Sequence, residues 1–180
     1  MSTTYPMAPL IRGTLLTLYL ALALPLPLLA TGLARTAMVL ATLLGFLLVL
    51  AATSERVRLD EEALSVGHPP WCAWLLRRGW RLEWGTIRSL KPMATSQGGR
   101  VYYVGSNDGA LHLLPQRIAG FPAFLACFQA RTGLSTAAVG RLTPAWTYQL
   151  LAVLSGALLL AELGGWALAQ SGGLQLAPAG

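Results

Sequence analysis

Charged residues are scarce in this chain, and their scarcity decides its class. They make up 11% of its 180 residues, whereas hydrophobic residues make up 54%. Soluble domains carry about 25% charged residues, so the composition excludes an ordinary soluble protein. Because the length allows about one domain, we expect an integral membrane protein that carries one small polar domain.

Histidine and cysteine are also rare, with two of each in the sequence. Cys72 and Cys127 form no Cys-x-x-Cys pair and have no histidine beside them, which argues against a zinc site and a disulfide framework and favours buried free thiols. His68 lies in a proline-rich loop, and His112 lies in a predicted strand, opposite the face presumed for the leucines on either side of it. A metal site needs about three or four clustered ligands, so we expect no metal and no other cofactor.

The sequence also lacks a catalytic constellation. A nucleophile needs a neighbouring base and a group that orients that base, and the chain offers no such set. Ser106 and Asp108 are explained by turn chemistry, and no glycine-rich phosphate-binding motif is present. The sequence therefore predicts a protein that is not an enzyme.

The charge that is present gathers in residues 55–141, which contain 11 of the 13 basic and 6 of the 7 acidic residues. The formal net charge is +6. In a membrane protein, basic residues fix the topology and attract anionic headgroups, so we expect no nucleic-acid partner. Residues 55–141 are predicted to be the polar domain, and the apolar segments on both sides of it are predicted to be membrane anchors.

Two apolar runs precede the polar domain and follow a short N-terminal tail, residues 1–11. Residues 12–54 are predicted to form a transmembrane hairpin, with helices over about 13–33 and 36–53. At about 1.5 Å per residue, each run is long enough to cross a hydrocarbon core of about 30 Å.

Pro25 and Pro27 are expected to end or kink the first of these helices near Leu24, because proline removes a backbone donor and restricts the residue before it. An alternative interpretation of the same run is a cleaved signal peptide, with Arg12 as its basic region. The second apolar run, which follows at once, favours the hairpin.

A third membrane helix is predicted over residues 145–169. Trp146 and Trp166 would stand about 30 Å apart along it, at the two interfaces that aromatic residues favour. Glu162 lies between them, and a carboxylate inside a membrane is a candidate functional group. The alternative is that Glu162 reaches the interface or caps a contact with another helix. Residues 170–180 are predicted to be a disordered tail.

Three spans place the N-terminus and the polar domain on one side of the membrane. Arg12, Arg56, Arg58 and Arg141 flank the membrane on that side, and Arg35 alone lies opposite. The positive-inside rule therefore predicts a cytoplasmic polar domain, in a bacterial plasma membrane or a thylakoid.

Within the polar domain, apolar and polar residues alternate as in β-hairpins. The predicted strand pairs are 57–59 with 64–66, 73–76 with 80–84, and 100–105 with 110–114, the last pair joined by an Asp-Gly turn. A further β segment begins at Ile87. Trp80, Leu82 and Trp84 are expected to share one face.

From Phe121 the spacing changes to that of a helix. Phe121, Phe124, Leu125 and Phe128 fall on one side, and Gly133 suits the C-terminal cap. The polar domain is thus predicted to be a small antiparallel sheet or barrel closed by one helix.

This order of elements resembles the membrane-anchored pleckstrin-homology-like domains of bacteria. The resemblance rests on VRLDEEALSV at 57–66, RRGWRLEWGTI at 77–87, YYVGSNDGALHLL at 102–114 and PAFLACFQARTG at 122–133. It covers roughly half of the chain, and its motifs are structural. It therefore implies a fold, a PH-like β barrel closed by one helix, rather than an activity.

A membrane hairpin followed by a small cytoplasmic β domain is also similar to the photosystem I assembly factor of cyanobacteria and plastids. The present chain departs from that factor by its third span and shares no motif with it. The likeness implies assembly of a photosynthetic membrane complex as an alternative function.

Two groups of residues are candidate binding surfaces. Basic residues near an anionic leaflet contribute about 1 kcal/mol of attraction each, and tryptophan is enriched at the centres of interfaces. The basic group can bind headgroups, dock to an acidic membrane partner or act only as a solvated face. Of the four residues Trp71, Trp74, Leu75 and Leu76, core packing is expected for at least two. The basic group is Arg77, Arg78, Arg81, Arg88, Lys91 and Arg100, and the apolar group is Trp71, Trp74 and Leu75.

Together these features predict a non-catalytic, membrane-anchored interaction module, a scaffold or accessory subunit of a membrane protein complex. Its predicted partners are membrane lipids and other integral membrane proteins. Assembly of a photosynthetic complex, binding of anionic headgroups and transport along a path that includes Glu162 are the alternatives.

Overall fold

The computed structural model describes residues 2–76, 78–96, 99–140 and 145–170. The chain divides into two compact units. One, which we call the sheet unit, comprises Met1–Arg12 and Leu50–Ala145, and the other, the helix unit, comprises Gly13–Val49 and Trp146–Gly180. Each unit is therefore built from two separate stretches of the chain.

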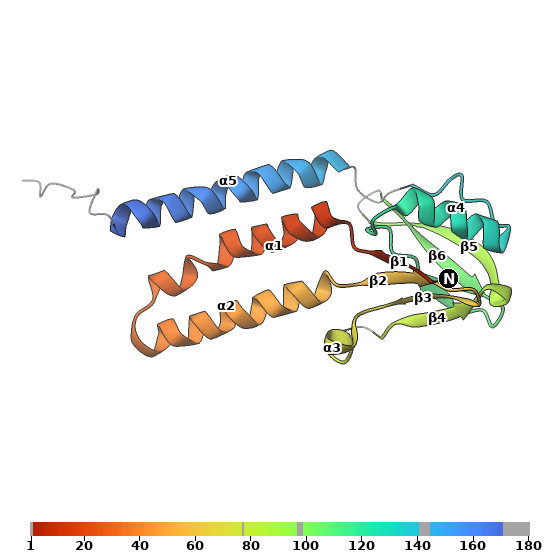
Figure 1. Cartoon of the computed structure of the whole chain (residues 1–180), viewed down its shortest axis with the longest axis horizontal. Helices are drawn as coiled ribbons and strands as arrows, with labels where there is room; N and C mark the ends of the chain where they lie inside the picture. The colour runs from red at the N-terminus through yellow and green to blue at the C-terminus, as the bar shows by residue number, and fades with distance from the viewer. Residues whose placement is uncertain (1, 77, 97–98, 141–144, 171–180) are drawn as a thin grey trace, which may run out of the picture. The chain divides into compact units, whose positions relative to one another are not determined.

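Among the described residues, the sheet unit contains seven strands in two antiparallel sheets (Figure 1). The first sheet has the order β1-β2-β3-β4, and the second has the order β5-β6-β7. The hairpins predicted at 57–66 and 100–114 are confirmed as β2-β3 and β6-β7. The strands are β1 Thr3–Pro6, β2 Arg56–Leu59, β3 Ala63–Gly67, β4 Trp80–Glu83, β5 Ile87–Ala94, β6 Arg100–Ser106 and β7 Leu111–Leu113.

Strand β1 comes from the segment before the membrane hairpin, so the prediction of a plain tail over residues 1–11 is wrong. Thr3 lies opposite Leu59 and Tyr5 lies opposite Val57. The Tyr5 ring also meets the edge of the Phe124 ring at a centroid distance of 5.7 Å. This strand forms because β2 offers it a row of unpaired backbone groups, and that partner is distant in the sequence.

The two sheets are not joined by any strand pairing within the described ranges, so they do not make the closed barrel that the sequence predicts. The 3₁₀ helix η2, Trp84–Thr86, separates β4 from β5. The chain leaves the first sheet at this point and begins the second. Pro92 lies within β5, which tolerates it as an edge strand.

The stretch 73–76 is not the strand that the sequence predicts. Instead, Pro70–Ala73 forms the short helix α3. Pro70 suits the first helical turn, where its missing N–H costs nothing, and the Trp74 indole N–H donates to the Trp71 carbonyl oxygen at 2.9 Å. Strand β4 therefore pairs with β3 rather than with residues 73–76.

Helix α4, Phe121–Thr132, supplies the two largest fully buried side chains of the core, Phe124 and Phe128. It ends as predicted, at Gly133 in the left-handed conformation with φ 70°. Trp80, Leu82 and Trp84 pack against the core from one face of the chain, which confirms the alternation predicted there. The four predicted helix residues, Phe121, Phe124, Leu125 and Phe128, are all buried.

His112 and Leu111 lie on opposite faces of β7, but it is His112 that faces the core. It pairs with the fully buried Val104, and its ring lies 5.1 Å from that of Trp80, whereas Leu111 is 47% exposed. Alternation gives the period of a strand, and register decides which set of side chains is buried. The presumed core face of β7 is therefore corrected.

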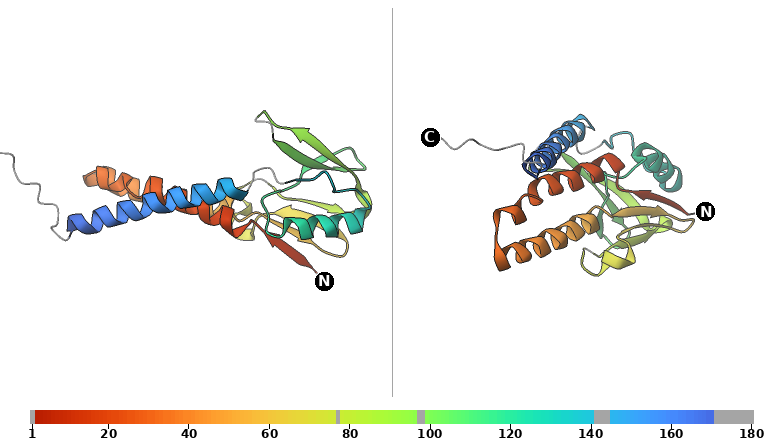
Figure 2. Two further views of the ribbon diagram at one scale, coloured as in Figure 1. Left: turned by 90° about the horizontal axis from the view of Figure 1, so that it is seen from above. Right: turned by 60° about the vertical axis from the view of Figure 1, so that its left-hand side comes forward.

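The helix unit carries the predicted membrane segments, which Figure 2 shows from two further sides. In the part of the chain that the structure describes, three segments are long and apolar enough to cross a membrane. Many of their leucines are exposed, as lipid-facing side chains are expected to be. The helices are α1 Pro9–Ala23, η1 Leu26–Leu29, α2 Gly32–Ala52 and α5 Ala145–Gln170.

The predicted break in the first span is confirmed, since α1 ends at Ala23 and Pro25 precedes η1. Helix α2 begins four residues earlier than predicted, at Gly32, and so includes Arg35. The Tyr19 hydroxyl of α1 donates to the Thr42 carbonyl oxygen of α2 at 2.8 Å, which joins the two helices of the hairpin. Residues 171–180, predicted to be a disordered tail, lie outside the described residues.

Candidate functional site

The first sheet has one end at which the chain passes into its membrane segments. Pro6, the last residue of β1, lies opposite Arg56, the first residue of β2. Arg56 in turn lies opposite Gly67, the last residue of β3. Because β1 leads into α1 and β2 follows α2, we call this end of the sheet the membrane end.

Helix α3 follows β3 at the membrane end and turns most of its apolar side chains outward. Trp71 is 51% exposed, Trp74 is 79% exposed and Leu75 is 49% exposed. Cys72 is the buried residue of this helix. Leu76 is half-buried, so the expectation that at least two of Trp71, Trp74, Leu75 and Leu76 are core is wrong. We call Trp71, Trp74 and Leu75 the tryptophan surface.

The predicted basic residues are distributed over both sheets. Arg81 lies on β4 of the first sheet, whereas Arg88 and Lys91 lie on β5 and Arg100 on β6 of the second. Arg78 precedes β4, and all five side chains are exposed. Arg77 lies outside the described residues.

Arg81 reaches the turn between β2 and β3, away from the membrane end. Its guanidinium lies 3.6 Å from the carboxylates of both Asp60 and Glu62. Asp60 also accepts the backbone N–H of Ala63 at 2.6 Å. That hydrogen bond lowers the pKa of Asp60 below its usual value, and the charge of Arg81 lowers it further. This arginine therefore stabilises a turn.

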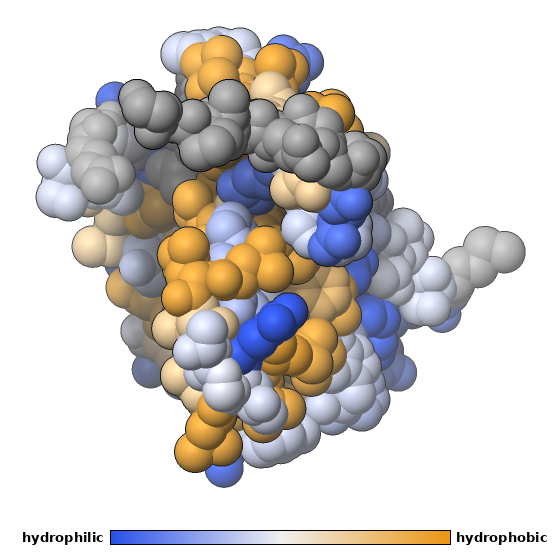
Figure 3. Space-filling model, turned by 90° about the vertical axis from the view of Figure 1, so that its left-hand side faces the viewer, coloured by the Kyte–Doolittle hydropathy of each residue, from blue (hydrophilic) through white to orange (hydrophobic). Residues whose placement is uncertain are grey.

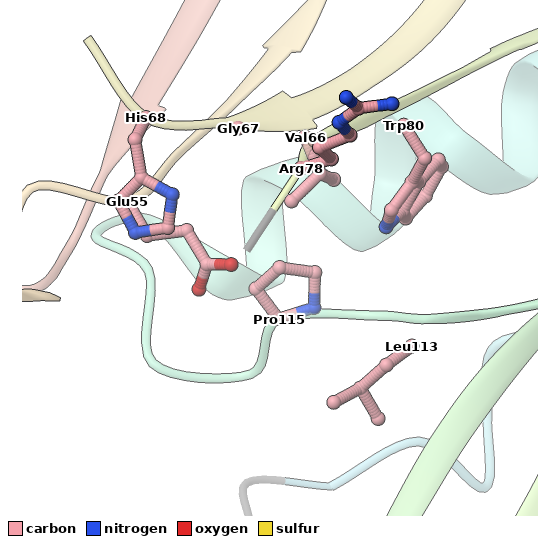
Figure 4. Close-up of a pocket in the computed structure, with 9 residues that line it drawn as sticks. Glu55, Val66, Gly67, His68, Arg78, Trp80, Leu113 and Pro115 are labelled. Carbon is pink, nitrogen blue, oxygen red and sulfur yellow. The ribbon is translucent and has the colours of Figure 1, made fainter. Parts of the chain in front are cut away.

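A cavity of about 60 Å³ lies beside the membrane end (Figure 4). His68 and Glu55 line it, and Figure 4 shows the Glu55 carboxylate turned toward Pro115 and the Arg78 guanidinium turned away from both. The Nδ1 atom of His68 is buried without a hydrogen-bond partner. A cavity of this size holds a water molecule that can satisfy such an atom. His68 and Glu55 meet because β2 pairs with β3, which no local motif indicates.

Glu162 lines a cavity of about 570 Å³ within the helix unit, and Arg35 lines it as well. The Oε2 atom of Glu162 is buried and has no hydrogen-bond partner. The walls are otherwise largely apolar, formed by residues such as Leu28 and Trp166. Figure 3 shows that hydrophobic residues also make up much of the surface on the side it views. The predicted bounds of the other two spans contain no charged residue. Helix α2 begins at Gly32, however, and therefore brings Arg35 into the helix unit as a charge opposite to that of Glu162.

Across the described ranges, no group of three or more histidine, cysteine, aspartate or glutamate side chains lies close enough to hold a metal ion. Asp60 and Asp108 of the sheet unit instead hold turns through hydrogen bonds to backbone N–H groups. The structure thus offers a surface and cavities for binding as its candidate sites.

Comparison with known proteins gives the chain a relative. It is 39% identical over 154 residues to the uncharacterized protein slr0269 of Synechocystis sp. (strain ATCC 27184 / PCC 6803 / Kazusa). The aligned region covers 82% of the chain and 77% of slr0269.

The chain belongs to the slr0269 family. No family model and no solved structure matches it. Because slr0269 itself is described as uncharacterized, the slr0269 family carries no activity over to this chain, and a function has to be argued from the residues.

Proposed function

We propose that the protein is a non-catalytic, membrane-anchored interaction module, a scaffold or accessory subunit that binds another integral membrane protein. Three helices hold its sheet unit at the cytoplasmic face of a bacterial plasma membrane or a thylakoid. The tryptophan surface is the observation that carries this proposal.

The fold of the sheet unit supports this kind of role. Seven antiparallel strands in two sheets, followed by one helix over the core, are compatible with the pleckstrin-homology-like fold that the sequence resembles, although the two sheets form no closed barrel among the described residues. Such a scaffold presents surfaces and needs no catalytic group of its own. Here the strand β1 is separated from β2 by the membrane hairpin, which would fasten the domain to the bilayer at two points.

The position of the tryptophan surface supports an integral membrane protein as the partner. Trp71 lines a cavity together with Leu50 and Ser54, the residues through which α2 leaves the membrane. Exposed tryptophans at that level lie among the headgroups. A protein that covers them must reach the same level, so the partner is an integral membrane protein with an apolar juxtamembrane surface.

Purification of the tagged full-length protein from its native membrane, followed by mass spectrometry, tests the proposal. The wild type is expected to recover a defined membrane protein, and the variant Trp71→Ala/Trp74→Ala is expected to lose it. Exposed residues contribute within about 0.5 kcal/mol to folding, so the variant should keep its fold. Leu111→Ala/Met93→Ala is the matched control, because both residues are about half exposed on the second sheet.

Recovery of the wild type without a partner protein would overturn the proposal. Retention of the partner by the tryptophan variant would overturn the role of this surface. Recovery with membrane lipid alone would show that the bilayer itself covers the tryptophans.

Assembly of a photosynthetic membrane complex is the second candidate function, favoured by the order of a membrane hairpin followed by a small β domain. An assembly factor binds a complex that is being built, whereas an accessory subunit remains in the finished complex. The same purification separates the two by the size of the recovered complex on a native gel.

A further inference from the structure

A second cavity, of about 320 Å³, lies at the membrane end of the sheet unit. Its lining comes from the end of β1, the first turn of α1, the end of α2, the start of β2 and the start of α3. These segments meet because β1 and β3 both pair with β2. The residues that matter below are Arg12, Leu50, Glu55, Arg56 and Trp71.

The cavity lies at the level of the membrane surface. Arg12 is in the first turn of the span Pro9–Leu29, and Leu50 is in the last turn of the span Gly32–Ala52. Residues at the ends of spanning helices stand at the headgroup level. A ligand in this cavity would therefore be in contact with the lipid headgroups.

The charge in the cavity is unbalanced. Arg12 and Arg56 are both half-buried, and none of the ion pairs found among the described residues involves either of them. Glu55 lines this cavity as well as the smaller one, and none of the ion pairs among the described residues joins it to these arginines. A guanidinium withdrawn from water without a carboxylate partner is costly, and an anion between the two would offset that cost.

We propose that this cavity binds the headgroup of an anionic phospholipid, with Arg12 and Arg56 on its phosphate. Guanidinium groups match phosphate oxygens in paired, charge-assisted hydrogen bonds. Leu50 and Trp71 provide apolar contacts for the glycerol and the first methylenes of the acyl chains. Two cationic groups against one carboxylate select an anionic headgroup over a zwitterionic one. This site shares Trp71 with the tryptophan surface, but its two arginines belong neither to that surface nor to the predicted basic group.

The test titrates the purified full-length protein, in mild detergent, with short-chain phosphatidylglycerol, with phosphatidylcholine and with glycerol 3-phosphate. Binding is read by the rise in thermal midpoint and by native mass spectrometry, since a ligand of the folded state raises its stability. Phosphatidylglycerol is expected to bind. Arg12→Gln/Arg56→Gln is expected to weaken it about tenfold or more, because charged hydrogen bonds are lost.

Arg88→Gln/Arg100→Gln is the matched control, because it removes the same charge from the second sheet. Full binding by this variant supports the site, and equal weakening in both variants would overturn it. Equal binding of phosphatidylcholine would overturn the charge selection. If glycerol 3-phosphate bound as tightly as phosphatidylglycerol, the site would be assigned to a soluble phosphate compound, and the proposal of a lipid ligand would be overturned. The single variant Arg56→Gln, which removes one of the two charges, gives the same test if the double variant does not fold.

Discussion

At the scale of single residues, Asp60 fastens the turn between β2 and β3 to the rest of the sheet unit. Its carboxylate accepts the N–H groups of Glu62 and Ala63. Its carbonyl oxygen accepts the Trp84 indole N–H at 3.0 Å, and also the Arg131 guanidinium of α4. Arg131 in turn lies over the Trp84 ring at 5.5 Å. One aspartate thus connects the first sheet, η2 and α4.

This arrangement predicts a pH dependence. Because folding lowers the pKa of Asp60, the carboxylate stabilises the fold above the ordinary aspartate pKa of about 3.9. That stabilisation is lost as the pH falls through the lowered pKa of the folded state. Asp60→Asn keeps an acceptor oxygen but loses the charge. We expect it to unfold more easily than the wild type at pH 7, with a difference that shrinks in acid.

Chemical unfolding followed by tryptophan fluorescence at several pH values measures this. Glu83→Gln, which removes one carboxylate from β4, is the control and is expected to change stability by less than about 0.5 kcal/mol. A difference between wild type and Asp60→Asn that stays constant with pH would contradict the assigned charge effect.

Single residues with local chemistry could be predicted from the sequence, and those whose role depends on pairing could not. Asp108 accepts the Ser106 hydroxyl and the Ala110 N–H in its turn, as its Asp-Gly sequence indicates. Glu55 and His68 come together through the register of β2 and β3. Arg12 and Arg56 lie 44 positions apart in the sequence and line one cavity.

At the scale of elements, the three membrane helices could be predicted because their apolar runs are long, and the phenylalanine helix could be predicted because its helical spacing extends over several turns. The two elements that the sequence missed are four residues each, β1 and α3. A four-residue apolar run has no period to distinguish helix from strand. Strand β1 has no hydrophobic pattern of its own and depends on the free edge of β2.

The helix unit permits a test of Arg35 and Glu162 as a pair. Replacing either with leucine leaves the other charge alone in a largely apolar cavity, which destabilises a fold. We expect the loss of stability in Arg35→Leu/Glu162→Leu to be smaller than the sum of the losses in the two single variants. The difference, which is the coupling energy of the pair, is expected to be about 1 kcal/mol. Thermal midpoints of the full-length variants in detergent measure it. Purely additive effects would show that the two side chains act independently.

At the scale of the whole molecule, the pairing of β1 with β2 constrains the topology. These strands flank the membrane hairpin and lie in one sheet, so both ends of the hairpin are on the same side of the membrane. The third span, α5, then carries the chain across. The basic residues that flank the hairpin predict that the sheet unit is cytoplasmic.

Reporter fusions test this arrangement. A green fluorescent protein fused before Ser2 is expected to fluoresce, and alkaline phosphatase fused after Gln170 is expected to be active outside the cytoplasm. The exchanged pair, with each reporter at the other position, is the control and is expected to be silent. Activity of alkaline phosphatase at the N-terminal position would reverse the predicted orientation.

The place of β1 also sets an order of events during synthesis. The ribosome makes this strand before the hairpin, whereas its partner β2 emerges after both helices of the hairpin. If the hairpin inserted with a single crossing, the two strands would end on opposite sides of the bilayer, and the first sheet would lack its outer strand and the Tyr5 contact with Phe124. The first sheet can thus be completed only in a chain whose hairpin has been inserted correctly. A wrongly inserted chain keeps an open sheet edge, and cellular proteases degrade incompletely folded proteins.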